Sequence, residues 1–181
     1  MFRSFVLTAL LALTAFAFPA PNALASAREI DMRVNETLDR FFYKIGGARE
    51  LANKSVGLLV FPSVVKAGFG VGGEYGEGAL RVRGETVDYY NTVSASIGFQ
   101  LGVQERSVII AFMTPQALDQ FRRTAGWKIG ADASVAIITV GIGGSIDTNK
   151  ITSPVVGFIL DPKGLMYNLT LEGSKISRIN P

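Results

Sequence analysis

The sequence predicts an α+β fold: a strongly curved, mainly antiparallel β-sheet or barrel-like roll, with N-terminal helices and one inserted helix. Two observations predict it. Apolar residues follow helical spacing up to about residue 54 and a period of two beyond it. Several of the predicted strands also alternate apolar residues with glycine or serine, which leaves one face of the strand bare. Bare faces let a sheet bend sharply, so we expect strong curvature.

The first 25 residues predict a secretory signal peptide. They contain one basic residue, Arg3, an apolar run from Phe5 to Phe18, and an A-x-A motif that ends at Ala25. The apolar run is shorter than the roughly 20 residues that a membrane-spanning helix needs. We therefore expect cleavage after Ala25, a single domain over residues 26–181, and an exported, periplasmic protein that associates peripherally with a membrane.

Residues 26–54 are predicted to be helical. Apolar residues recur at spacings of four, four, three and four, which is typical of an amphipathic helix, and Gly46 ends the pattern. We favour packing of this apolar stripe on the protein's own sheet over packing on a membrane. A short second helix is expected over residues 48–53. The stripe consists of Ile30, Val34, Leu38, Phe41 and Ile45.

Residues 55–181 are predicted to form the sheet, with one helix near 115–125. That helix has Thr114 as its N-cap and Pro115 at its first position. "SVGLLVFP" predicts a buried strand, and three runs rich in small residues follow: "AGFGVGG", "SASIGFQLGV" and "ADASVAIITVGIGG". "PVVGFIL" and "LMYNLTL" predict two strands joined by a tight turn across Asp161–Gly164, and "GSKISRINP" predicts a short edge strand. We expect Trp127 to pack in the core.

The stretch "GFGVGG" at Gly68–Gly73 matches the dinucleotide-binding pattern G-x-G-x-x-G, and Asp88 lies about twenty residues after its start. That pattern needs a helix to begin inside it, because the pyrophosphate binds to the free N–H groups of the helix. Here "EYGEGALRVRGETVD" follows, which predicts a hairpin instead. We therefore interpret these glycines as a bare strand face and expect no nucleotide and no other cofactor.

The composition argues against an enzyme. The chain has no histidine and no cysteine, so imidazole bases, thiolate nucleophiles and imidazole or thiolate metal ligands are absent. Asp132 and Asp147 are better explained as turn or strand-end residues than as a catalytic pair. We expect no catalytic and no metal-binding residues. The 18 basic residues barely exceed the 15 acidic ones, which argues against nucleic-acid binding.

Several segments resemble the SYLF-domain family, also called the YSC84-related lipid-binding domain. They are "VGLLVFPSVVKAGFGVGGEYGEGAL", "SASIGFQLGVQERSVIIAFMTPQAL", "GADASVA" and "GLMYNLTLEGSKI", in the order of the family, and the similarity runs from about Ala48 to Ile179. The resemblance implies lipid binding. Eukaryotic members bind phosphoinositides and other anionic phospholipids, partly through a basic amphipathic N-terminal segment, and some fungal members bind actin. Bacterial members are exported, stand-alone domains, which is what we expect here, and export argues against actin binding.

The resemblance implies an anionic phospholipid or membrane surface as the partner, and the residues allow two modes of binding. In the first, the N-terminal helices dock on the membrane, with an aromatic residue in the interface and basic residues on the phosphates. In the second, the glycine- and serine-lined sheet holds an acyl chain, with basic residues at the mouth of the groove. The candidate lipid-binding residues are Arg40, Phe42, Lys44, Arg49, Lys54 and Lys66.

A second hypothesis is a structural or envelope protein-interaction module for which lipid contact is incidental. It predicts a protein partner and indifference to lipid. Glycine-rich strands also suit a dimer interface, so the sequence leaves the oligomeric state open.

Overall fold

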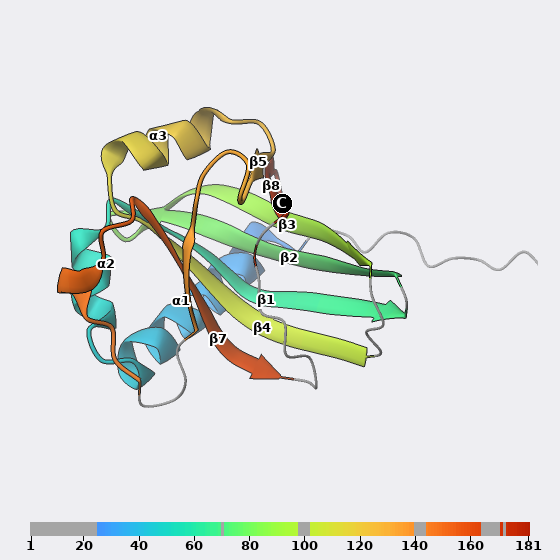
Figure 1. Ribbon diagram of the computed structural model, residues 1–181, viewed down its shortest axis with the longest axis horizontal. Helices are drawn as coiled ribbons and strands as arrows, with labels where there is room; N and C mark the ends of the chain where they lie inside the picture. Colours follow the sequence, from blue (N-terminus) through green and yellow to red (C-terminus); the bar gives the residue numbers. More distant parts are fainter. Residues whose placement is uncertain (1–24, 70, 98–101, 140–143, 164–170, 172) are drawn as a thin grey trace, which may run out of the picture.

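The computed structural model describes residues 25–69, 71–97, 102–139, 144–163, 171 and 173–181 (Figure 1). Its strands form one eight-stranded sheet in the order β5-β8-β3-β2-β1-β4-β7-β6. The predicted α+β fold with a curved sheet is confirmed. The elements are α1 (Ala27–Lys44), α2 (Ala48–Lys54), β1 (Gly57–Phe69), β2 (Val71–Val82), β3 (Glu85–Ile97), β4 (Gly102–Phe112), α3 (Pro115–Arg123), β5 (Trp127–Lys128), β6 (Ala136–Thr139), the 3-10 turn η1 (Thr148–Lys150), β7 (Val155–Lys163) and β8 (Lys175–Ile179).

The three helices begin where the sequence predicts. The Ser26 hydroxyl accepts a hydrogen bond from the N–H of Glu29 (3.3 Å) and caps α1. Thr114 caps α3 in the same way, by accepting from the N–H of Ala117 (3.3 Å), and Pro115 follows it. No helix in the described ranges has both the length and the hydropathy needed to cross a membrane.

Helix α1 lies on one face of the sheet, behind the strands in Figure 1. Its stripe is buried against β1, β2, β4 and β7, and the Phe41 ring lies 5.5 Å from that of Phe158 in β7. At its N-terminal end, the Asp31 carboxylate accepts hydrogen bonds from Thr86 (2.7 Å) and Tyr89 (2.9 Å) of β3. Packing of the stripe on the protein's own sheet is therefore confirmed.

The opposite face of the sheet is covered by α3, β5 and β8 (Figure 1). Phe121 of α3 meets Trp127 edge to face at 5.2 Å, and Phe112 of β4 lies 4.9 Å from Phe121. Trp127 is 1% exposed, which confirms core packing.

A β-bulge in β1 bends the sheet. Between Val60 and Ser63, β1 has one residue more than its neighbours β2 and β4, and Pro62, which has no N–H to donate, lies within it. Strand β2 passes so close to the bulge that a Cβ atom at Gly78 would overlap the carbonyl oxygen of Val60. The glycine face predicted for this strand therefore serves close backbone approach.

The hairpins are confirmed. Strands β1 and β2 pair up to Phe69 and Val71, so "GFGVGG" lies in a hairpin with no helix after it. Strands β2 and β3 are joined by Arg83 and Gly84, both with positive φ (53° and 85°), as a two-residue type I′ turn requires.

Three details differ from the prediction. Strand β7 continues through Asp161 and Pro162 to Lys163, so the predicted turn does not begin at Asp161. Strand β8 is not at an edge, because it pairs with both β3 and β5. Strand β6 is an edge strand parallel to β7 in an otherwise antiparallel sheet. Residues 1–24 of the predicted signal peptide and most of "LMYNLTL" lie outside the described residues.

Candidate functional site

Of the six candidate residues, the structure brings two, Phe42 and Arg49, into contact. The Arg49 guanidinium lies over the Phe42 ring, 5.0 Å from its centroid. Such cation–π contacts contribute about 0.5–1 kcal/mol at exposed sites. Arg49 is exposed and Phe42 is half-buried against the core under α1. Tyr43, the next residue of α1, is 91% exposed.

The pair lies beside a groove between α1, α2 and the β2–β3 turn, which we call the helix groove. Its volume is about 710 Å³, within the range typical of small-molecule sites. Leu38, Phe42 and Val82 contribute apolar surface, and Arg81 and Arg83 contribute positive charge. The groove is lined by Asn35, Leu38, Phe42, Ala52, Asn53, Ser55, Val56, Gly57, Leu58, Arg81, Val82, Arg83, Gly84, Pro115, Leu118 and Asp119.

The two arginines of the β2–β3 hairpin differ in how far their guanidinium groups are held by other residues. Arg81 donates hydrogen bonds to the side chain of Asn35 (2.8 Å), to the carbonyl of Gly84 (3.2 Å) and to the carboxylate of Asp31 (3.5 Å). These bonds connect α1 to the hairpin. Arg83 is exposed at the turn. The sequence showed these arginines only as strand residues that alternate with Leu80 and Val82. Their position next to α1 depends on tertiary packing.

Arg40, Lys44 and Lys54 do not line the helix groove. Arg40 donates hydrogen bonds to Thr37 (3.2 Å) and to Ser107 of β4 (3.4 Å). Lys54 bonds the Thr148 hydroxyl (3.0 Å) and the Glu50 carboxylate (2.7 Å), which ties α2 to η1. The hydrogen bond from Lys54 lowers the pKa of the Glu50 carboxyl group. Lys44 is half-buried, and its side chain interacts with another group of the protein.

Lys66 is buried in β1 and does not line the helix groove. Its ammonium is 3.4 Å from Oε1 of Glu74, and Arg106 is 2.7 Å from Oε2 of the same carboxylate. All three side chains are at most 7% exposed. A surface contact with lipid phosphate is therefore not open to Lys66 in this fold, and we call these three residues the buried ion cluster.

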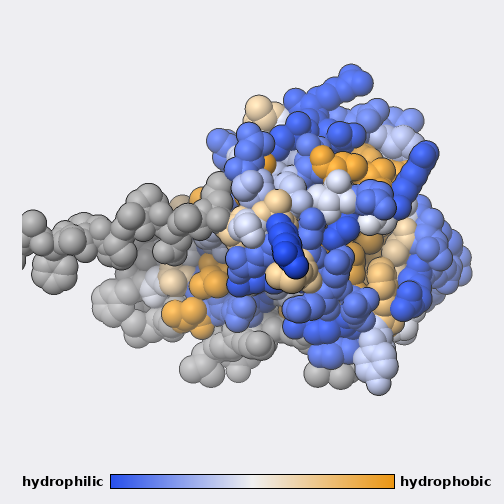
Figure 2. All heavy atoms as spheres, turned by 180° about the vertical axis from the view of Figure 1, so that it is seen from behind, coloured by the Kyte–Doolittle hydropathy of each residue, from blue (hydrophilic) through white to orange (hydrophobic). Residues whose placement is uncertain are grey.

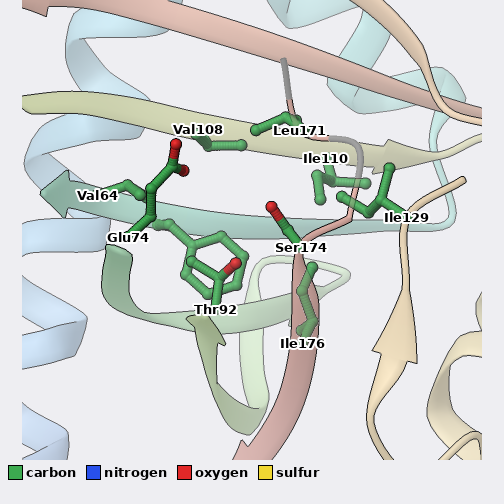
Figure 3. A pocket seen from close by; sticks show the side chains of 10 residues that line it. Val64, Glu74, Thr92, Val108, Ile110, Ile129, Leu171, Ser174 and Ile176 are labelled. Carbon is green, nitrogen blue, oxygen red and sulfur yellow. The ribbon is translucent and has the colours of Figure 1, made fainter. Parts of the chain in front are cut away.

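A small cavity lies beside the buried ion cluster (Figure 3). Glu74, Thr92 and Ser174 line it together with the apolar side chains of neighbouring strands. Its volume of about 10 Å³ is close to that of a single water molecule.

Nothing in the described ranges forms a metal site, since no group of three or more acidic residues gathers there. Asp132 accepts a hydrogen bond from the backbone N–H of Lys128 (2.6 Å), and Asp147 caps η1 by accepting from the N–H of Asn149 (3.1 Å). Both turn assignments are confirmed.

Residues 93–180 match the family model Ysc84, described as "Las17-binding protein actin regulator". No curated protein matches the chain. The matched region runs from β3 to β8, whereas the helix groove also takes residues from α1, α2 and β2.

Proposed function

This chain is a Ysc84-related (SYLF-domain) protein, and from that premise we propose that it binds anionic phospholipid at a membrane surface through the helix groove. The observation that supports the proposal is the contact between the Arg49 guanidinium and the ring of Phe42, which lines an apolar groove. Arg83 lines the same groove. Aromatic rings suit the boundary between lipid chains and head groups, and each basic residue near an anionic surface contributes about 1 kcal/mol.

The burial of the α1 stripe supports a contact through the outer side of the helix rather than through its apolar face. Ile30, Val34 and Phe41 are buried in the core, so α1 presents its outer side and its C-terminal end. Tyr43 and Arg49 are exposed at that end. The proposed contact is therefore shallow, with ring edges in the interface and guanidinium groups on phosphates, rather than an inserted amphipathic helix.

The test is co-sedimentation with phosphatidylglycerol and phosphatidylcholine vesicles over a range of salt concentrations. The double variant Arg49→Glu/Arg83→Asn is suited to it. Glutamate is favoured in the first turn of α2, and asparagine accepts the positive φ of residue 83. We expect at least a tenfold loss of affinity for phosphatidylglycerol vesicles, from about 1 kcal/mol per basic residue.

Arg123→Glu, at the exposed end of α3, is the matched control and should reduce binding much less. Equal losses in the two variants would show a general charge effect and would contradict the helix groove. Absence of vesicle binding in the unmodified protein, together with capture of a protein partner, would favour the structural or envelope-interaction alternative.

The same proposal includes export and a role without catalysis. The 1–25 segment is proposed to direct the chain to the periplasm, with cleavage after Ala25. N-terminal sequencing of the protein from a periplasmic fraction tests this, because the proposed mature chain begins at Ser26. A chain that retains residues 1–25 and stays with the membrane would contradict it.

A further inference from the structure

A row of exposed side chains crosses the face of the sheet that carries α1, beyond the end of the helix. Directly paired positions on five strands place Val65, Tyr75, Val93, Lys175 and Lys128 next to one another in that order. The three apolar members are 40%, 44% and 45% exposed. We call this row the sheet stripe. It combines an apolar segment with two positive charges at one end.

The sheet stripe borders a second groove, of about 1070 Å³. Val65, Tyr75 and Val93 line it, and toward the strand tips Ala67 and Gly73 form a row of small residues. The first turns of α1 form the wall on the other side. Figure 2 shows the face of the molecule that carries α1, where hydrophobic atoms are exposed among hydrophilic ones.

Two lysines carry positive charge at one end of the sheet stripe, outside the lining of the groove. Lys128 and Lys175 are direct cross-strand partners on one face, and both are exposed. Like charges in this arrangement repel each other unless an anion lies between them. Neither ammonium group makes an ion pair with any residue that the structure describes. The aliphatic part of Lys175 lies against Gly126, where any side chain would overlap its Cε atom.

The width of the apolar surface favours one hydrocarbon chain rather than two. On the helix side, the next paired positions are Ser63, Glu77 and Asn91, which are polar. Glu77 accepts a hydrogen bond from the Tyr75 hydroxyl (2.5 Å), so that side of the groove is polar. Four strand spacings separate Val65 from Lys128, which is about 19 Å.

We propose that the sheet stripe binds one long-chain fatty acid, with its carboxylate between Lys128 and Lys175 and its chain over Val93, Tyr75 and Val65. The site shares no residue with the helix groove, so this inference goes beyond the proposed membrane contact. It would make the protein a carrier or sensor of a single-chain anionic amphiphile.

The first test is calorimetric titration of the purified chain with hexadecanoate below its aggregation concentration. Lys128→Met/Lys175→Met keeps the aliphatic stems and removes both charges. We expect one bound molecule and at least a tenfold loss of affinity in this variant, since charge-assisted hydrogen bonds are the strong ones. The matched control is Lys150→Met, an exposed lysine on η1 that lies outside the groove and should bind as before.

The second variant, Gly73→Val, fills the row of small residues. A Cβ atom at Gly73 meets only the Ser94 carbonyl oxygen, at 3.6 Å, and valine suits a strand, so the variant should fold. We expect it to lose hexadecanoate binding while its affinity for phosphatidylglycerol vesicles is unchanged. Arg49→Glu/Arg83→Asn should show the opposite pattern, which separates the two proposals.

Four results would overturn the inference. Hexadecanoate could fail to bind to the unmodified protein. It could also bind to Gly73→Val and to the lysine double variant as tightly as to the unmodified protein. Hexadecyltrimethylammonium could bind as tightly as hexadecanoate, which would show that charge is not recognised. A change of oligomeric state in Gly73→Val without any fatty-acid binding would assign the sheet stripe to contact between two copies of the chain.

Discussion

Strands β1–β4 are built differently in their two halves. In the half under α1, Val60, Ala79 and Ile109 face the helix, while Leu59, Leu80 and Ile110 face α3 and β5, and all six are fully buried. In the other half the helix face exposes the sheet stripe, and the opposite face holds the buried ion cluster. The difference teaches that apolar burial on both faces stabilises the half under α1, whereas buried ion pairs stabilise the opposite face of the other half. On its helix face the other half leaves apolar side chains exposed.

The largest expected effect lies in the covered half. Phe41→Ala removes a ring that is 1% exposed and should lower the free energy of unfolding by about 3–5 kcal/mol, because it leaves a cavity. Tyr75→Ala in the uncovered half removes a ring that is 44% exposed and should cost far less. Urea unfolding of both variants measures the contrast. Equal losses of unfolding free energy in the two variants would contradict the difference between the covered and the uncovered half.

The next effect concerns the buried ion cluster. Glu74→Gln leaves Lys66 and Arg106 without the carboxylate that both contact, and the loss of one partner from a buried pair costs about 3–5 kcal/mol. Glu105→Gln, an exposed carboxylate on the same half of the sheet, is the control and should change stability little. A similar small change in both variants would show that the uncovered half carries no stability of its own.

Two glycines of β2 sharpen the comparison. Gly78→Ala should destabilise the protein by about 1–3 kcal/mol, since its Cβ atom would overlap the bulge of β1. Gly73→Ala has room and should be neutral or stabilise the protein by about 0.5–1 kcal/mol, because glycine is unfavourable in a strand. Thermal unfolding of the pair measures the difference, and the reverse order would contradict the bulge geometry.

The smallest effect is a pH dependence at Tyr75. Burial, followed by the hydrogen bond to Glu77, raises the pKa of the Tyr75 hydroxyl from 10.0 to about 12. The folded state therefore holds this proton more tightly than the unfolded state. The resulting stability is present below pH 10 and is lost as the pH rises toward 12. Tyr75→Phe should flatten the decline in urea stability over this window, and an unchanged profile would contradict the raised pKa.

Local patterns predicted most of the elements. The stripe of α1, the cap Thr114 and the hairpin at Gly68–Gly73 depend on neighbouring residues, and the structure confirms each of them. The mixed direction of the sheet was missed, because the parallel pairing of β6 with β7 brings together residues about twenty positions apart. Nothing in the composition of β6 specifies that direction.

The candidate sites were predictable only in part. Phe42 and Arg49 are close in sequence, and their contact follows from two adjoining helices. Arg83 reaches the same groove from a hairpin, and the paired lysines of the sheet stripe are 47 positions apart, so sequence spacing gives no signal for either. Lys66 was misplaced because the clustering of basic residues along the chain does not show which face of a strand each one occupies.

The bulge at Pro62 also governs how the chain tolerates insertions and deletions. Side chains alternate between faces with a period of two, and the extra residue shifts the phase of β1 from that point on. Without Pro62 the strand would alternate regularly from Val60 onward, so Val65 would still pair with Tyr75 on the helix face and Lys66 would stay on the inner face. Deletion of this one residue would therefore preserve both faces of the strand, whereas deletion of a residue outside the bulge would exchange the inside and the outside of the residues beyond it.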